Sequence, residues 1–257
     1  MSTPASPAPW LTNERLRLRE FSLADRHALV RMHKDPRVRA LLVDDQPLDR
    51  HAVVHEFIVR LQKLYRQYEG LGIWCAERMV AALDASDLAR PEVREMLSPS
   101  MLARLVEPRP RFAGWFNLMP MSVRPDEVEL GSRLLPEAWG TGLSLKGGQL
   151  LLEHAFNTLG RDRVWAASHI ANRGVRYCVT ALGFEDRGVQ EYEGKPAQHY
   201  VIDVSRWRHW QTLSRKAQQR HAVAACRALA NRAGDGQTAS ADSAIDILNT
   251  RERSRSA

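Results

Sequence analysis

The residues best suited to chemistry lie in a glycine-rich turn near the middle of the chain. The run Leu134-Leu-Pro-Glu-Ala-Trp-Gly-Thr-Gly-Leu-Ser-Leu-Lys predicts a strand that ends in a turn and leads directly into a helix. Backbone N–H groups without obstructing side chains, at the positive end of a helix, can bind a phosphate or pyrophosphate. A tight strand-to-helix connection would also account for Gly140 and Gly142, so the pattern alone leaves both interpretations open.

A second informative run lies further along the chain. The run Asn172-Arg-Gly-Val-Arg-Tyr-Cys-Val-Thr-Ala-Leu predicts a helix that begins at an asparagine cap and ends at Gly183, before Phe184. Between the two runs, residues 164–170 predict a strand. Together they predict a strand, a glycine turn and a helix, followed by a strand and a second capped helix.

The other elements follow from hydrophobic periodicity and from helix start signals. Leu16 and Leu18 alternate with arginines, which is the pattern of a strand with one buried face. Strands are expected within residues 11–21, 73–76, 112–118, 127–135, 164–170 and 199–204. Helices are expected after Ser22 and Pro47, and in residues 145–159 and 173–182. This order mixes antiparallel pairs with βα crossovers and predicts an α+β, or mixed α/β, fold.

Several segments lie outside this pattern. Residues 79–110 are too long for a hairpin loop and carry their own helix signals, so we interpret them as a helical insertion. Residues 206–233 predict one basic helix. Residues 1–10 are rich in proline and serine, and residues 234–257 in glycine, serine, aspartate and threonine, so we expect disorder at both ends.

The net charge of +7 arises in the C-terminal part of the chain. Seven basic residues and no acidic ones lie between Val204 and Gly234, so the rest of the chain is balanced. Trp207 and Trp210 share one face of the expected helix, and we expect that face to be buried while the cations stay in water. A balanced body argues against a nucleic-acid groove in the main domain. The tail could contact RNA or another anionic partner, or form a solvated helix face.

Length and composition favour a single domain with additions. The chain has 257 residues, 44% of them hydrophobic, which is enough for one core. It lacks a stretch of roughly 18 apolar residues and a secretory N-terminal pattern, so we expect a cytoplasmic protein that does not engage membranes. Cys75, Cys178 and Cys226 are far apart, so we expect reduced thiols and no metal site.

The order and spacing of these motifs resemble a known superfamily. The segment Pro136-Glu-Ala-Trp-Gly-Thr-Gly entering a helix, then a strand, an Asn172-started helix and Leu182-Gly-Phe, is similar to the GNAT N-acetyltransferases of the RimJ/RimL type. The opening run LTNERLRLREF also resembles that branch, and the likeness covers the domain expected at residues 11–205. It implies a sandwich with a central mixed, mostly antiparallel sheet flanked by helices.

The resemblance also implies a cofactor site for acetyl-CoA. The amides of the turn from Trp139 to Ser144 would hold the pyrophosphate, the strand end would pair with the pantetheine arm, and Asn172 would reach that arm or cap its helix. The implied cofactor-binding residues are Leu134, Leu135, Trp139, Gly140, Thr141, Gly142, Leu143, Ser144 and Asn172. Lys146 and Arg176 are candidate phosphate partners, or exposed helix cations.

Acetyl transfer needs a base for the amine and an acid for the departing thiolate. Glu129 matches a frequent acidic position of the family and is the candidate base, although it could instead face solvent or pair with Arg133. Weaker candidates are Glu127, Ser132 and His169. The chain departs from the family pattern at two places. Where a serine or tyrosine often serves as the acid, it has Val175 and Val179, and Tyr177 is turned to another face of the helix. After the glycine turn, Leu145-Lys-Gly replaces the common Thr-Glu-Ala.

The sequence therefore predicts an enzyme that moves an acetyl group from acetyl-CoA to a primary amine. The acceptor is expected to be a protein N-terminus or a small molecule. Two alternatives stay open at this point: a catalytically silent protein that binds acyl-CoA, and a module that contacts RNA or the ribosome through the basic tail. A homodimer is also compatible with the sequence.

Overall fold

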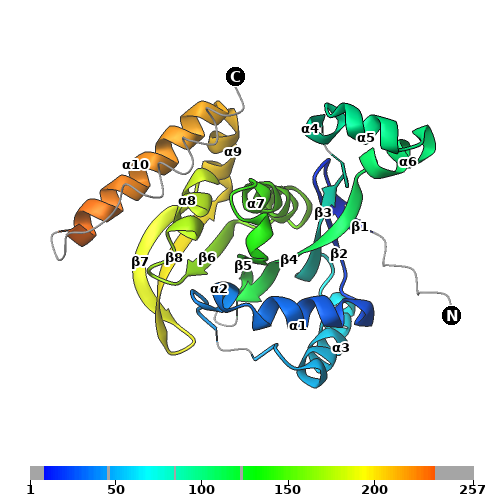
Figure 1. Ribbon diagram of the computed structural model, residues 1–257. Helices are drawn as coiled ribbons and strands as arrows, with labels where there is room; N and C mark the ends of the chain where they lie inside the picture. The colour runs from blue at the N-terminus through cyan, green and yellow to red at the C-terminus, as the bar shows by residue number, and fades with distance from the viewer. Residues whose placement is uncertain (1–8, 45–46, 84, 122–123, 235–257) are drawn as a thin grey trace. The chain divides into compact units, whose positions relative to one another are not determined.

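The computed structural model describes residues 9–44, 47–83, 85–121 and 124–234 (Figure 1). The chain divides into two compact units, residues 1–164 and residues 165–257. The expectation of disordered ends falls on residues 1–8 and 235–257, which lie outside the described residues. The first strand begins two residues inside the expected N-terminal tail, because Trp10 stacks on Trp74 with ring centroids 4.1 Å apart.

The first unit contains five antiparallel strands that pair in chain order. They are β1 (Pro9–Thr12), β2 (Leu16–Arg19), β3 (Gly72–Val80), β4 (Arg109–Met121) and β5 (Arg124–Leu134). Arg19, Cys75, Trp115 and Arg133 are register partners from β2 to β5. Because paired residues of antiparallel strands point to the same face, these four side chains form one row across the sheet.

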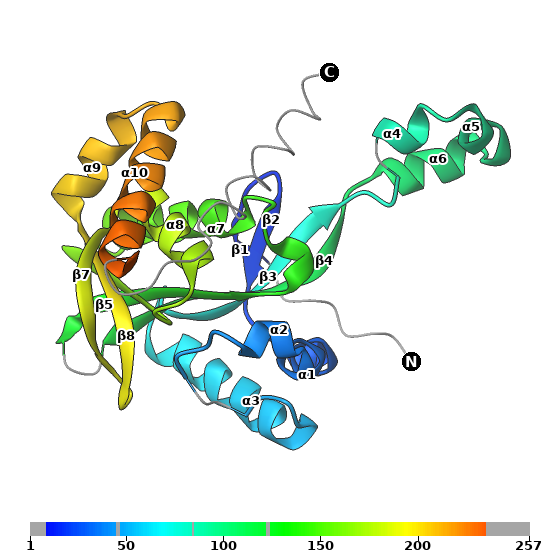
Figure 2. The same cartoon turned by 60° about the vertical axis from the view of Figure 1, so that its left-hand side comes forward.

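Three helices cover the face of the sheet that carries this row (Figure 2). They are α1 (Arg26–Lys34), α2 (Pro36–Arg39) and α3 (His51–Gln67), and the short 3-10 turn η1 (Leu23–Asp25) leads into them. Their apolar side chains, among them Met32 and Phe57, form one core with Cys75 and Trp115. This burial is what holds the helical layer on the sheet.

Helix α7 (Leu143–Glu153) lies on the opposite face of the same sheet (Figure 2). It follows the 3-10 turn η2 (Pro136–Ala138) and continues into the π-helical turn η3 (His154–Thr158). A methyl group at Gly147 would approach the Phe116 ring of β4 to 2.2 Å, which no real contact allows. Helix α7 can therefore lie this close to β4 only with glycine at position 147.

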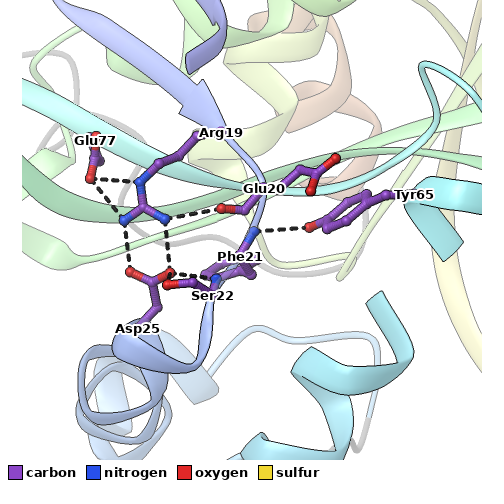
Figure 3. A network of polar contacts seen from close by, with 7 residues as sticks. All are labelled: Arg19, Glu20, Phe21, Ser22, Asp25, Tyr65 and Glu77. Atoms are coloured by element: carbon purple, nitrogen blue, oxygen red, sulfur yellow. Dashed lines mark hydrogen bonds and ion pairs between the residues drawn. The ribbon is translucent and has the colours of Figure 1, made fainter. Parts of the chain in front are cut away.

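A buried charge network joins β2, β3 and the start of α1 (Figure 3). The Arg19 guanidinium donates to Asp25 at 2.7 and 2.8 Å and to Glu77 at 2.9 Å. Burial opposes the charge of Arg19, but its hydrogen bonds to Asp25 and Glu77 raise its pKa. Removing one partner of such a network leaves an uncompensated buried charge, so Arg19 fixes where the chain turns from strand to helix.

Three short helices stand between β3 and β4, in the segment expected as a helical insertion (Figure 2). They are α4 (Ala85–Leu88), α5 (Pro91–Met96) and α6 (Pro99–Val106). Neither α5 nor α6 has a fully buried side chain, and Met96 is 82% exposed. The apolar side chains of the insertion thus shield one another from water only in part.

The second unit begins within β6 (Arg163–Ser168), at Trp165. It also contains the antiparallel hairpin of β7 (Glu185–Tyr192) and β8 (Lys195–Asp203). Strand β7 is absent from the sequence-based expectation because most of its residues are exposed and it has no alternating apolar pattern. Its turn at Glu193-Gly194 has positive φ at both positions, as a type I′ hairpin turn requires. Each unit combines strands and helices, which confirms the α+β class.

The C-terminal segment packs as two helices rather than the one expected over residues 206–233. Helix α9 (Val204–Thr212) ends at the extended residue Leu213, and Ser214 then caps α10 (Arg215–Gly234). Trp207 and Trp210 are buried, as expected, and the Trp210 ring covers Gly183 at the end of α8 (Arg173–Ala181). None of the described helices is long and apolar enough to cross a membrane.

Candidate functional site

The glycine turn of the first unit exposes backbone rather than side chains. Gly140 and Gly142 have φ of +69° and +79°, in the left-handed region that favours glycine, and added methyl groups there would meet open space. The neighbouring side chains bond back to the chain: Trp139 Nε1 donates to Leu134 O at 2.9 Å, and Thr141 Oγ1 donates to Ala138 O at 2.7 Å. The outer surface of the turn is therefore open to a ligand that binds amides.

This turn forms the N-terminal end of α7. Gly142 is the N-cap, and the bond from Lys146 N to Gly142 O begins the helical ladder at 3.1 Å. The N–H groups of Leu143, Ser144 and Leu145 precede that ladder, as the first amides of any helix do. The Leu143 side chain is buried and anchors the turn. The partial positive charge of the helix end and these amides favour an anion at this point.

At the end of β5, the backbone N–H and C=O of Leu134 point away from β4. Leu134 is opposite Gly114, and the Leu135 N–H donates to Ala113 O at 2.9 Å. In an antiparallel ladder this pattern marks a non-hydrogen-bonded pair, so the N–H and C=O of Leu134 point to the side opposite β4. The Leu134 carbonyl accepts a hydrogen bond from the Trp139 indole at 2.9 Å.

Glu129 lies on β5 opposite Met119 and is half-buried. The register of β5 is regular from Val128 to Leu134, so Glu129 and Arg133 point to the same face, the one that α1 and α3 cover. Glu127 also lies on β5 and binds Arg124 and Arg163 at 3.2 and 3.4 Å. Ser132 points to the other face and is exposed.

Four residues further along β5, on the same face as Glu129, the structure reveals a buried polar network that the sequence does not indicate. Arg133 binds Asp44 at 2.5 Å and places a second nitrogen 2.7 Å from His33 Nε2, while its guanidinium lies 4.6 Å from the centre of the Trp115 ring. His33 Nδ1 lies 2.9 Å from Leu29 O. Because a carbonyl only accepts, Nδ1 carries the proton and Nε2 accepts from Arg133. Burial, more than any other cause, lowers the pKa of His33 to about 4.

No sequence motif links these residues, because His33, Asp44 and Arg133 come from three distant segments. The period-2 pattern of β5 places Arg133 on the same face as Glu129, and this is the signal that could have assigned it to the buried side. Arg133 meets His33 only because of where α1 packs on the sheet, and helix propensity and hydrophobic periodicity do not define that position.

The candidates of the second unit have structural partners. Asn172 Oδ1 accepts from Val175 N at 3.1 Å, which confirms its role as the cap of α8. His169 Nδ1 accepts from Ala171 N at 3.2 Å, and Arg176 donates to Ile170 O at 3.0 Å. Val179 is buried in the core. In the part of the chain that the structure describes, no cluster of three or more His, Cys, Asp or Glu residues could hold a metal ion.

Comparison with known proteins supports one family. A family model described as an acetyltransferase (GNAT) domain matches residues 15–185. The FsC-acetyl coenzyme A-N(2)-transacetylase of Aspergillus fumigatus is 30% identical over 79 residues, which are 28% of this chain and 34% of that protein. The chain thus matches about a third of the length of this curated relative.

Two solved structures share the fold at low sequence identity. The ribosomal-protein acetyltransferase RimL in complex with coenzyme A has a TM-score of 0.57 and 12% identity, covering 77% of this chain and 99% of its own. RimJ of Mycobacterium smegmatis, in complex with a CoA-disulfide, has a TM-score of 0.54 and 15% identity, covering 79% of this chain and 87% of its own.

The buried His33 generates a prediction for the pH dependence of stability. Its pKa in the folded state is lower than in the unfolded chain, so the unfolded chain binds more protons between about pH 6.5 and pH 4, and stability falls as the pH decreases through this window. The shift corresponds to about 3 kcal/mol. Urea unfolding at pH 7 and pH 4.5 should show a loss about 2–3 kcal/mol larger in the parent than in His33→Gln, which keeps an acceptor for Arg133. Equal losses in both proteins would contradict this assignment.

Proposed function

Because the chain belongs to the GNAT acetyltransferase family, we propose that it transfers an acetyl group from acetyl-CoA to a primary amine. The observation that carries the proposal is the turn from Trp139 to Ser144, which offers open amides at the start of α7. The pyrophosphate of acetyl-CoA would bind these amides, and the Leu134 N–H would donate to the pantetheine arm. Asn172 is a further proposed contact of that arm.

Glu129 is the proposed general base. A half-buried carboxylate near the buried row of the sheet can accept a proton from the attacking ammonium, directly or through a water molecule. The neutral amine then attacks the thioester carbonyl to form a tetrahedral intermediate. As the intermediate collapses, the C–S bond breaks, and the second proton of the nitrogen passes to the departing coenzyme A thiolate, directly or through water, to leave the amide and the free thiol. The His33 and Arg133 network fixes the strand beside Glu129. The acceptor is proposed to be a protein N-terminus or a small amine.

The glycine turn is tested by Gly142→Val, which should abolish acetyl-CoA binding measured by calorimetry. A branched side chain would occupy the open space through which the pyrophosphate approaches the amides. Gly194→Val is a matched control, because Gly194 has the same φ of +79° and also faces open space but lies in the β7–β8 hairpin. Equal affinities of the two folded variants would refute the assignment of the turn.

The base is tested by Glu129→Gln, which should lower kcat by about 10²- to 10⁴-fold at neutral pH while acetyl-CoA affinity is preserved. The defect should shrink at high pH, where more of the amine is already neutral. Glu127→Gln is the control from the same strand, since Glu127 is paired with Arg124 and Arg163. A parental kcat in Glu129→Gln would mean that another group or solvent takes the proton. A parent that binds acetyl-CoA but acetylates no amine would favour the silent alternative.

A second proposed function concerns the basic surface of the C-terminal helices. Lys216, Arg220 and Arg227 are exposed and lie on one side of α10, being four and seven residues apart, and we call them the basic face. No acidic residue occurs from Val204 to Gly234 to balance them. Such a face could hold the phosphate backbone of an RNA.

Replacing all three cations of the basic face by glutamine should weaken binding to a single-stranded RNA and make the slope of log K against log salt shallower by about 2. Replacing Arg60, Lys63 and Arg66 of α3 is a matched control, since it removes the same three exposed charges from the first unit. Fluorescence anisotropy over a salt series measures both quantities. If the two triple variants bind RNA equally, the basic face is only a solvated surface.

A further inference from the structure

A cavity of about 410 Å³ opens in the first unit, and its lining includes Glu137 and Ala138, which directly precede the glycine turn. It is lined by Arg31 and Asp35 of the α1–α2 segment, by Arg78 of β3, by the start of β4, and by the residues that follow β5. Its volume is within the range of small-molecule sites. None of the residues from Trp139 to Ser144 lines it.

The arginines that line this cavity use few of their N–H donors in hydrogen bonds with the described residues. Arg31 and Arg111 make no ion pair or side-chain hydrogen bond with any residue that the structure describes. Arg78 makes one hydrogen bond, to the Glu137 backbone carbonyl at 3.3 Å, which uses one of its five N–H groups. Three guanidinium groups therefore line one cavity with most of their donors available.

The acidic residues of the cavity do not cancel this charge. Asp35 accepts from Arg37 at 2.7 and 3.0 Å, and these hydrogen bonds, more than any other cause, lower the pKa of Asp35. Arg31, Arg78 and Arg111 line the cavity together with Asp35 and Glu137. Arg37 lies outside the lining but pairs with Asp35, so these four arginines and two carboxylates sum to a formal charge of +2. A phosphate monoester carries about −1.5 to −2 at pH 7 and so matches this charge better than a single carboxylate does.

The remaining lining is apolar and suits an organic group attached to the phosphate. Phe112 and Leu135 both belong to or pack against the core beneath α1, and Ala138 is buried. These side chains are fixed by that core, so the apolar surface is already formed without a ligand. A site of this size with cations and an apolar wall would hold more than a bare inorganic ion.

We propose that this cavity binds the phosphate monoester of a small organic molecule, with Arg31, Arg78 and Arg111 as the anion-binding residues. The monoester could belong to an independent ligand or be the 3′-phosphate of coenzyme A, which has the same chemistry. The site is distinct from the amides of the glycine turn, which would bind a pyrophosphate through backbone groups. The proposal stands whether or not the protein proves to be an active acetyltransferase.

The test is calorimetric titration of the full chain with inorganic phosphate at constant ionic strength. The double variant Arg31→Gln/Arg111→Gln should bind phosphate at least about 10-fold more weakly than the parent, because it loses two charge-assisted contacts. Arg60→Gln/Arg66→Gln removes two exposed charges from α3 and should bind as the parent does. In a Gly142→Val background, which removes binding at the amides of the glycine turn, Arg31→Gln/Arg111→Gln should still weaken the remaining phosphate binding by at least about 10-fold. No binding by the parent, or equal binding by the two double variants, would overturn the proposal.

A second titration identifies the source of the phosphate. If the cavity holds the cofactor, Arg31→Gln/Arg111→Gln should weaken binding of coenzyme A but not of 3′-dephospho-coenzyme A. If it holds an independent ligand, both coenzyme forms should bind this variant and the parent equally, while the loss of inorganic phosphate binding persists. Phosphate binding that is weakened in Gly142→Val but not in Arg31→Gln/Arg111→Gln would place the anion at the glycine turn and refute the cavity site.

Discussion

The close approach of α7 to β4 is the constraint on which the candidate site depends. Gly147 lies against the Phe116 ring, where even a methyl group would overlap it, so the helix axis is held at a depth that only glycine permits. Once α7 is fixed there, its first turn and the amides from Gly140 to Ser144 are fixed at the end of β5. This contact accounts for glycine at position 147, where the family pattern often has alanine.

The two faces of the sheet in the first unit support different parts of the structure. The face under α7 supports the amide turn, whereas the face under α1 and α3 holds the row from Arg19 to Arg133. Both arginines of this row are buried and engage carboxylates at 2.5 to 2.9 Å, and both tie a helix-bearing segment to the strands. The candidate base Glu129 thus extends from a strand that is braced by ion pairs on one face and by helix packing on the other.

The sequence predicted the elements whose chemistry is local. The glycine turn, the Asn172 cap and the alternation of Leu16 and Leu18 each depend on a few neighbouring residues, and all three are present. Strand β7 escaped prediction because its exposed residues carry no hydrophobic period, and the break between α9 and α10 depends on one serine cap. The network of His33 and Arg133 and the arginine cavity join distant segments, so they follow from the tertiary packing that no local pattern encodes.

We propose that acetyl-CoA binds through the backbone of the turn at the start of α7. Amide hydrogen exchange with and without acetyl-CoA tests it most directly, because it reports on the proposed donors themselves. The amides from Gly140 to Ser144 should exchange at least about tenfold more slowly when the cofactor is bound, since hydrogen-bonded amides are protected. Cofactor binding that leaves these amides unprotected, with protection confined to other segments, would show that the turn does not hold acetyl-CoA.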